Sequence, residues 1–241
     1  MKVSVSALSY CYNDGTPVLE DIDFCADKHQ ITAILGSSGS GKSTLLRIIS
    51  GLLSPLKGAV CIDDLPVLGC GKDRSVLSVN TPLLPWMSVR ANIVFALRQY
   101  GLPHIASKAD KIIRRLDIED FGDRYPLTLS SGMTKQAMLA RAIAVPSELL
   151  LLDEPLAEVD PNKRSFYHAQ LRQIAEDRTI ILVTHDLDEA LQLAHKIYLL
   201  DKDERRMTHC WHPADHLQVS VYGELKREIL TYYRQEEERT L

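Results

Sequence analysis

The sequence predicts an α/β fold with a mostly parallel sheet, an N-terminal antiparallel β region and an inserted helical region. Short apolar runs alternate with helix-like segments over 31–53 and again after Pro146, and this alternation is typical of parallel strands joined by helices. The alternating pattern over 3–24 is broken by Asn13-Asp14-Gly15, which is a strong hairpin signal. The stretch from Pro82 to Pro146 changes to helical spacing, which indicates the inserted region.

The elements follow in chain order. Two antiparallel strands are expected over 3–24, then a strand at 31–35, a helix over 45–53 and a short strand at 59–62. The inserted region contains helical patterns at 89–100 and 105–116, separated by Gly101 and Pro103. After Pro146 we expect strands at 149–152 and 179–183 and helices at 161–176 and 186–194. Asp160 and Pro161 favour the first of these helices, since aspartate is a good N-cap and proline is favourable at the first helical position.

A glycine-rich loop stands between the strand at 31–35 and the helix that follows it. The loop consists of Gly36, Ser37, Ser38, Gly39, Ser40, Gly41, Lys42, Ser43 and Thr44. Glycines let the backbone turn tightly, so that successive N–H groups converge on an anion at the positive end of the helix. Lys42 is expected to reach the β and γ phosphates, and the Ser43 hydroxyl to ligate Mg²⁺. A flexible loop without a ligand is the alternative, but the flanking strand and helix favour a P-loop NTPase core that binds a nucleoside triphosphate.

An acidic pair follows a second apolar strand. Four leucines at 149–152 precede Asp153-Glu154-Pro155. Such a run is typical of a strand buried on both faces, although periodicity alone does not distinguish it from a buried helix segment. We expect Asp153 to serve the metal through water and Glu154 to act as general base on the attacking water. A core strand that ends in a polar turn is the alternative, which the loop at 36–44 disfavours.

Composition limits the possible classes. The 241 residues, 25% of them charged and 45% hydrophobic, suit one or two soluble domains. The apolar runs stop well short of the about 20 residues of a membrane span, and the first residues lack the apolar core of a secretory signal, so we expect the chain in the cytosol. The net charge of −4 and pI near 6.1 give no electrostatic footprint for nucleic acid, and no nucleic-acid partner is expected.

A cluster of possible zinc ligands lies near the C-terminus, at His209, Cys210, His212 and His216, but its spacing fits no standard zinc site.

Further motifs resemble those of the ATP-binding subunits of ABC transporters. Leu129-Ser130-Ser131-Gly132-Met133 looks like the signature of that family and opens a helix over 134–144. A serine-glycine turn that leads into a helix is also an anion-binding device. In the family the signature, here Ser130 and Gly132, completes the ATP site of a neighbouring subunit in a head-to-tail dimer. An ordinary capped helix is the alternative.

The same resemblance, which covers nearly the whole chain, assigns roles to three more residues. Asp160 has the position of a residue in the loop that links the two sites across the dimer. His185 matches the switch histidine that contacts the γ phosphate. Tyr12 matches the aromatic residue that stacks on adenine, with Tyr10 as the less favoured candidate and a packing role as the alternative. The implied organisation is a single ABC ATPase domain over 1–241, with a nucleotide-binding core (1–81 and 147–210), a helical subdomain (82–146) and a C-terminal helical extension (211–241).

Within the family, the segments at 83–89 and 222–230 look most like the nitrate, sulfonate and taurine importer group. This resemblance implies an ATPase that uses ATP and Mg²⁺ to energise uptake of a small solute. The implied partners are a second ATPase subunit, in a homodimer, and a transmembrane permease, with a solute-binding protein as an indirect partner. The implied location is peripheral, at the cytoplasmic face of the cell membrane.

Two residues depart from the family pattern. Val79 stands where the family has a glutamine that touches Mg²⁺ and the attacking water, although Asn80 could replace it if the loop is shifted by one. Ser131 stands where glycine is usual, which puts a β-carbon where a neighbouring phosphate approaches. These departures imply an alternative, a degenerate subunit that binds ATP, hydrolyses it poorly and acts as a regulatory or structural partner. A soluble ABC ATPase of nucleic-acid maintenance or translation is a third possibility, but the sequence shows neither the coiled-coil insertion nor the second cassette usual there.

Overall fold

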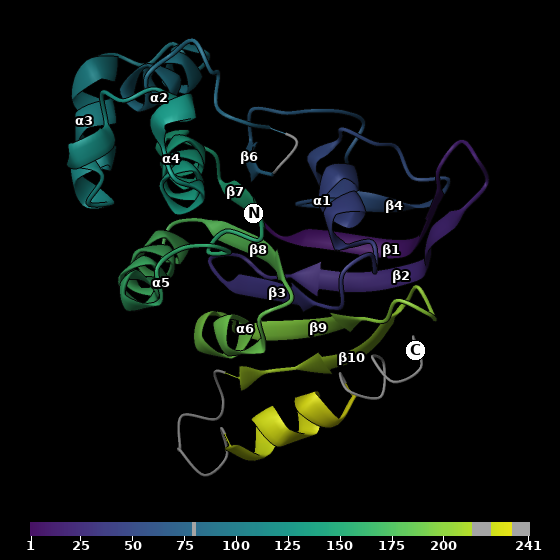
Figure 1. Ribbon diagram of the computed structural model, residues 1–241. Helices are drawn as coiled ribbons and strands as arrows, with labels where there is room; N and C mark the ends of the chain where they lie inside the picture. The colour runs from purple at the N-terminus through teal and green to yellow at the C-terminus, as the bar shows by residue number, and fades with distance from the viewer. Residues whose placement is uncertain (79–80, 214–222, 233–241) are drawn as a thin grey trace.

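The computed structural model describes residues 1–78, 81–213 and 223–232 and confirms the predicted α/β fold. Its described strands form two sheets (Figure 1). The antiparallel sheet has the order β2-β1-β4-β5, formed by β1 (Val3–Cys11), β2 (Pro17–Ala26), β4 (Lys57–Ile62) and β5 (Leu65–Pro66). The second sheet has the order β10-β9-β3-β8-β7-β6, formed by β3 (Ile31–Leu35), β6 (Arg74–Leu77), β7 (Leu149–Asp153), β8 (Thr179–Thr184), β9 (Lys196–Leu200) and β10 (Met207–Trp211). Within it only β10 pairs antiparallel, with β9, among the described strands.

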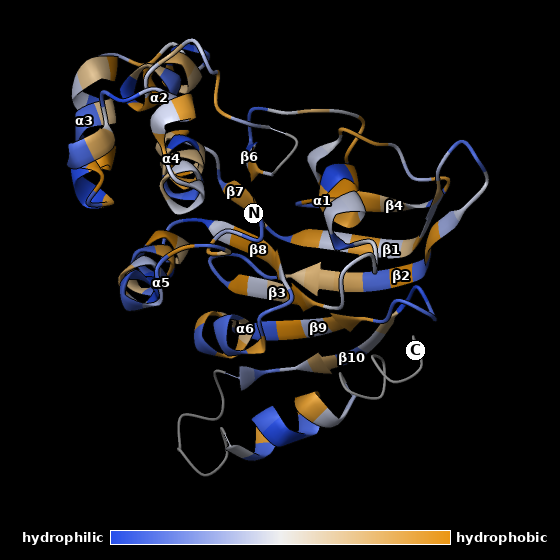
Figure 2. Ribbon diagram, in the orientation of Figure 1, coloured by the Kyte–Doolittle hydropathy of each residue, from blue (hydrophilic) through white to orange (hydrophobic). Residues whose placement is uncertain are grey.

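The second sheet is covered on both faces, which explains the four leucines of β7. Leu150 and Leu152 join one hydrophobic cluster with α5 (Pro161–Ala175) and α6 (Leu187–Leu193). Leu149 and Leu151 join the other, with α1 (Lys42–Ser50) and the antiparallel sheet. Because successive side chains of a strand point to opposite faces, a strand covered on both faces is apolar at nearly every position. Figure 2 shows the hydrophobic colour along β7 and β8.

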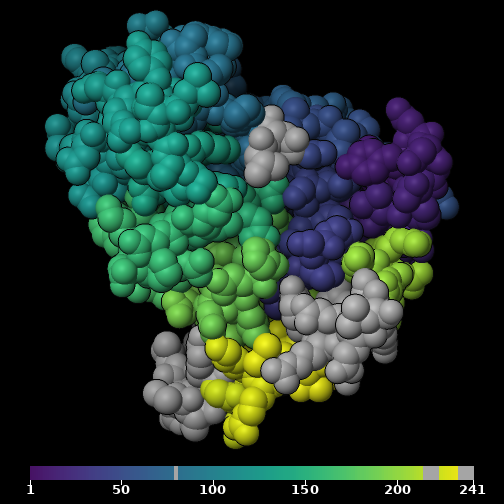
Figure 3. All heavy atoms as spheres, viewed as in Figure 1, coloured from purple at the N-terminus to yellow at the C-terminus, as the bar shows by residue number. Residues whose placement is uncertain are grey.

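The inserted region forms a group of helices at one end of the molecule. It contains α2 (Val89–Arg98), α3 (Ile105–Arg115) and α4 (Ser131–Ala144), with 3₁₀ turns at Glu119–Phe121 and Pro126–Thr128. Figure 3 shows these helices as a teal lobe beside the sheet region. The predicted helices are confirmed with shifted ends. The helix α4 begins at Ser131 rather than at 134 because the Ser130 side chain caps it, and α1 begins at Lys42 rather than at 45.

The chain after α6 adds strands that the sequence does not predict, namely β9 and β10, and β5 and β6 are likewise without a sequence prediction. A helix over 223–232 follows β10, and the Trp211 Nε1–H donates to Glu228 Oε1 at 2.9 Å to join the two. None of the described helices combines the length and the apolar composition that crossing a bilayer requires.

Candidate nucleotide site

The glycine-rich loop connects β3 to the start of α1 and holds strained backbone that glycine permits. Gly39 and Gly41 have φ of 85° and 100°, in the left-handed region that residues with a β-carbon rarely adopt. A β-carbon on Gly41 would also lie 2.9 Å from Leu19 Cδ2. The hydroxyl of Ser40 is buried without a hydrogen-bond partner among the described residues. An unpaired buried donor inside a tight loop at a helix N-terminus suits a cradle for an anionic ligand.

Lys42 is the first residue of α1, and its side chain folds back over the loop. Its ammonium group donates to the backbone carbonyls of Gly36 at 2.7 Å and Ser37 at 2.8 Å. The side chain is buried, and a buried ammonium is stable only when its protons are accepted by nearby oxygens. The lysine is therefore held directly over the loop by contacts that phosphate oxygens are able to replace.

Asp153 ends β7 opposite α1 and forms the centre of a small oxygen cluster. The Ser43 hydroxyl donates to Asp153 Oδ1 at 2.9 Å, and the Ser78 hydroxyl donates to Asp153 Oδ2 at 3.3 Å. The Asp153 side chain is only 4% exposed. Hydroxyl and carboxylate oxygens are the ligands that Mg²⁺ prefers, usually with several waters retained. The donor set of Ser43 and Asp153 therefore fits this metal.

Glu154 lies one residue beyond this cluster, in a turn with unusual backbone geometry. Its φ is 50°, and its N–H donates to the Val183 carbonyl of β8 at 3.0 Å. Glutamate rarely adopts a left-handed conformation, and such residues are concentrated at functional sites. The His185 Nδ1 lies 2.9 Å from Glu154 Oε1. The two side chains predicted to be catalytic are thus in hydrogen-bond contact, at the ends of the neighbouring strands β7 and β8.

Glu189, in α6, is a buried carboxyl next to Glu154 that the sequence pattern does not reveal. Its side chain is 5% exposed, and its Oε2 accepts from the Thr184 hydroxyl at 2.6 Å. Burial raises the pKa of Glu189 to about 7, and the nearby Asp186 and Glu154 carboxylates add to the rise, while the bond from Thr184 opposes it. A buried carboxyl therefore titrates near neutral pH beside the predicted general base.

Tyr12 lies where the antiparallel sheet meets α1. Its hydroxyl shares a 2.9 Å hydrogen bond with Thr44 Oγ1, and its ring contacts Tyr10 edge-on at 5.2 Å between centroids. Tyr12 as a whole is 40% exposed, so part of the residue remains accessible to a ligand. This placement suits the stacking role that the family resemblance implies.

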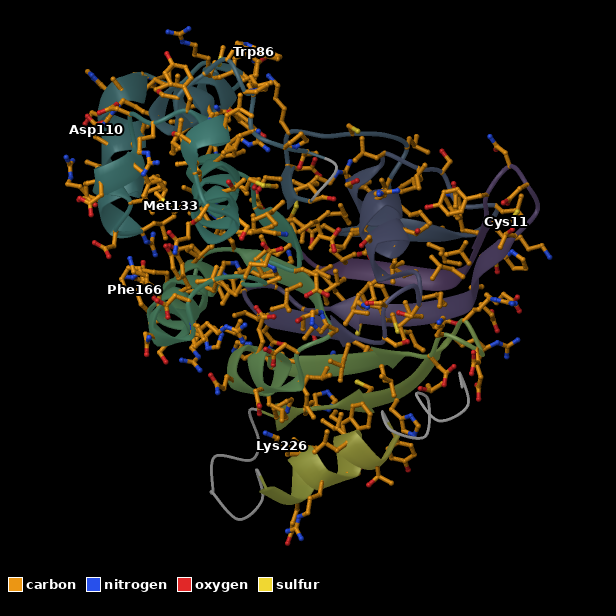
Figure 4. All side chains as sticks on the ribbon, viewed as in Figure 1. Cys11, Trp86, Asp110, Met133, Phe166 and Lys226 are labelled. Carbon is orange, nitrogen blue, oxygen red and sulfur yellow. The ribbon has the colours of Figure 1, made fainter. Side chains whose placement is uncertain are left out.

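The signature residues lie apart from α1, at the start of α4 (Figure 1). Ser130 caps α4, its hydroxyl accepting from the Met133 N–H at 3.3 Å, and Figure 4 places Met133 at the end of α4 nearest α5. A β-carbon on Gly132 would lie 2.7 Å from the Glu158 carbonyl oxygen. Asp160 caps α5, its Oδ1 accepting from the Asn162 N–H at 2.9 Å. These residues form a second group, joined to the first by the short loop between Glu154 and Asp160.

Some residues of the sequence analysis lie elsewhere. Val79 and Asn80 are outside the described residues, as is His216. His209 is an aromatic packing residue, stacked on Trp211 with ring centroids 5.2 Å apart. In the described part of the chain, no group of three or more His, Cys, Asp or Glu residues is arranged to hold a metal ion. Ser78 and Glu189 are site residues that the sequence pattern does not reveal. Ser78 reaches Asp153 from the end of the neighbouring strand β6, and Glu189 belongs to the site because α6 folds back against the end of β8 and bonds to Thr184.

The arrangement defines a class of protein. A mostly parallel sheet, a glycine-rich loop between β3 and α1, and an acidic pair at the end of β7 together define an α/β nucleoside triphosphatase.

Comparison with known proteins gives the family. Residues 19–157 match the model of the ABC transporter family. A taurine import ATP-binding protein of Pseudomonas putida is 36% identical over 197 residues, which are 80% of this chain and 75% of the relative. An uncharacterized ABC transporter ATP-binding protein of Methanocaldococcus jannaschii is 37% identical over 186 residues, 76% of this chain and 70% of the relative. The chain belongs to the ABC transporter family and is an ABC-type ATPase, and its predicted resemblance to the taurine importer group is confirmed.

Solved structures agree with the fold. The dimeric structure of a bacterial ABC transporter cassette matches with a TM-score of 0.81 at 22% identity, over 88% of this chain and 98% of that chain. The dimeric post-hydrolysis state of such a cassette, bound to ADP and Pi, matches with a TM-score of 0.79 at 23% identity over the same shares. At these identities the likeness supports the fold.

Proposed function

We propose that this chain is the ATP-hydrolysing subunit of an ABC importer for a small solute such as a sulfonate, taurine or nitrate. The contact of 2.9 Å between Glu154 and His185, next to the lysine-bearing loop, is the observation that supports hydrolysis best. The importer direction and the solute class rest on the relatives named as taurine import ATP-binding proteins.

In this proposal each group of residues has one task. The phosphates of ATP lie on the loop from Gly36 to Thr44, and Lys42 exchanges its two carbonyl partners for β and γ phosphate oxygens. Ser43 and Asp153 would hold Mg²⁺, which when bound would neutralise charge on the phosphates. Glu154 accepts the proton of the attacking water, and His185 orients Glu154 and contacts the γ phosphate. Tyr12 stacks on the adenine.

The partners follow from the second group of residues. Ser130, Gly132 and Asp160 lie away from the glycine-rich loop of their own chain, so in the proposal they complete the ATP site of a second copy. A homodimer of this kind binds two ATP molecules between its subunits. The dimer docks on a transmembrane permease at the cytoplasmic face of the membrane, and a solute-binding protein delivers the solute to the permease.

The substitution Glu154→Gln tests the catalytic assignment. The variant keeps the shape of the side chain but removes the base, so ATP hydrolysis should fall by about 10²-fold or more. Affinity for Mg-ATP, measured by calorimetry, should stay within about threefold of wild type, because binding depends on the loop and on Asp153. Glu148→Gln, at an exposed glutamate just before β7, is the matched control and should hydrolyse normally. Normal turnover in Glu154→Gln would refute the assignment.

Restoring the residues that the family usually has at positions 79 and 131 distinguishes a degenerate subunit, which hydrolyses ATP poorly, from an active ATP-hydrolysing subunit. In Val79→Gln combined with Ser131→Gly, a gain in hydrolysis of about tenfold or more, equivalent to about 1.4 kcal/mol in the barrier, would favour a degenerate subunit. An unchanged rate of hydrolysis would favour the ATP-hydrolysing importer subunit. Ser131 is exposed at the first turn of α4, so this substitution leaves the core intact.

A further inference from the structure

The Thr184 hydroxyl lies between two carboxyl groups. Its Oγ1 is 2.6 Å from Glu189 Oε2 and 3.5 Å from Glu154 Oε2. The Asp186 N–H donates to the same oxygen at 3.0 Å. A buried residue of α6 is thereby connected through one hydroxyl to the predicted general base.

A hydroxyl has one proton, and this limits what Thr184 can do. When Glu189 is ionised, the Thr184 hydroxyl donates its hydrogen bond to Glu189, which is at the shorter distance. Glu154 then receives no hydrogen bond from Thr184. When Glu189 is protonated, its own O–H donates to Thr184 Oγ1. The oxygen then accepts two hydrogen bonds, from Glu189 and from the Asp186 N–H, and its proton is available to Glu154. The protonation of Glu189 thus decides which carboxyl Thr184 serves.

We propose that Glu189 is a positioning residue for Glu154 and that it acts through the Thr184 hydroxyl. The proposal rests on the proposed function, in which Glu154 is the base. A carboxylate held by donors on both oxygens, His185 on Oε1 and Thr184 on Oε2, is fixed in one orientation toward the attacking water. A carboxylate held on one oxygen only is free to turn about its last torsion.

The surroundings of Glu189 favour a neutral carboxyl. It lines a cavity of about 310 Å³ together with Glu154, Leu156, Ala157, Glu158, Arg164, His168, His185 and Asp186. Arg164, which lines the same cavity, donates to Asp186 Oδ2 at 2.7 Å, so its charge is shared with another carboxylate. Burial lowers the pKa of His168, which therefore faces the cavity as a neutral ring. Glu189 Oε1 has no hydrogen-bond partner among the described residues.

Burial, the largest cause, raises the pKa of Glu189 to about 7, so its protonation changes near neutral pH. Below this pH Glu189 is protonated, Thr184 donates to Glu154 and the base is fixed. Above it Glu189 ionises and accepts the hydrogen bond of the Thr184 hydroxyl, which then no longer donates to Glu154. Hydrolysis by the wild type should therefore decline as pH rises, relative to a variant in which position 189 does not titrate.

The test compares kcat of the wild type and Glu189→Gln. The glutamine amide is neutral at every pH and donates to Thr184, so the ratio of wild-type to variant kcat should fall about fivefold from about pH 6 to about pH 8.5, the value of one net hydrogen bond. The same comparison in a Thr184→Val background should give a constant ratio, because the hydroxyl is gone. Thr184→Ser keeps the hydroxyl and should keep the pH dependence. Thermal melts confirm that each variant is folded.

The outcomes separate this inference from the proposed function. A wild-type protein that hydrolyses no ATP at either pH contradicts the proposed function. A wild type that hydrolyses ATP, with a ratio to Glu189→Gln that does not change with pH, overturns the role of Glu189 alone. The same holds if the pH-dependent ratio persists in the Thr184→Val background, since the effect would then not pass through the hydroxyl.

Discussion

Replacing Glu189 with glutamine should stabilise the nucleotide-free protein more at high pH than at low pH. The carboxyl lies under α6, 5% exposed, with one oxygen bonded to Thr184. Its pKa in the fold is about 7, raised by burial from an ordinary value of 4.5. The unfolded chain loses this proton near pH 4.5, whereas the folded chain keeps it until pH rises through about 7. The protonated Glu189 therefore makes its full contribution to the free energy of unfolding below the unfolded pKa of 4.5. This contribution is lost as pH rises through the folded pKa of about 7.

The size of the loss in unfolding free energy follows from the shift in the pKa of Glu189. A raised pKa of this size corresponds to on the order of 3 kcal/mol between the two protonation states. Most of it appears between about pH 5 and about pH 8, where the wild type should lose about 2 kcal/mol of unfolding free energy relative to Glu189→Gln. Titrating groups that do not interact with Glu189 affect both proteins equally, so the difference reports Glu189 together with the Asp186 and Glu154 carboxylates coupled to it.

Urea unfolding of both proteins at several pH values measures this difference directly. Plotted against pH, the unfolding free energies of the two proteins should differ least at acid pH and separate as pH rises. Glu189→Gln should be the more stable protein at the alkaline end. A difference that stays constant across the range would show that Glu189 titrates like an exposed glutamate. That result would refute the assignment of a neutral, buried carboxyl and would remove the physical basis of its control over Thr184.

Three further predictions concern the other residues of the site. Gly132→Ala should lower the melting temperature, because the new β-carbon would lie 2.7 Å from the Glu158 carbonyl oxygen. The overpacking cost of about 1–3 kcal/mol exceeds the gain in helix propensity of at most about 1 kcal/mol. Gly69→Ala is the control and should melt like wild type, because a β-carbon at Gly69 would have nothing within 4 Å. Asp160→Ala should cost about 1 kcal/mol of stability through loss of the α5 cap, and Asp160→Ser should restore most of it in the same unfolding assay. Tyr12→Ala should weaken ATP binding by roughly tenfold, measured by calorimetry, whereas Tyr12→Phe keeps the ring and should bind nearly as wild type; equal affinities for the two variants would contradict stacking.

The sequence was sufficient wherever one segment carries the whole signal. The glycine-rich segment at 36–44 follows β3 as predicted, and its last three residues form the first turn of α1. Gly39 and Gly41 have left-handed backbone, which is why glycines mark this segment in the sequence. The buried strand at 149–152 was predictable because a strand covered on both faces is typically a nearly continuous apolar run. Asp160 was predictable as a helix start, because an aspartate cap before proline needs no tertiary contact.

Features that depend on contacts between distant segments were not predictable. β6 has the short sequence Arg74–Leu77, and it is a strand because it pairs with β7, not because of its own pattern. β9 follows α6 without a turn signal and is defined by its parallel pairing with β3. Glu189 reads as an ordinary charged residue in the first turn of a helix. Only the return of α6 toward β7 and β8 places it beside Glu154.

The two groups of predicted site residues are parts of one connected structure. The chain runs from Glu154 to Asp160 in seven residues, of which Glu154 and Glu158 have φ of 50° and 67°. One end of this loop is fixed to β8 through the Glu154 N–H. Its middle contacts Gly132 at the start of α4 with no space for a methyl group. Because a tightly packed contact transmits displacement instead of absorbing it, we expect a shift of α4 to move the loop and, through it, Glu154. Loosening the contact between Gly132 and Glu158 should therefore weaken the coupling between α4 and Glu154.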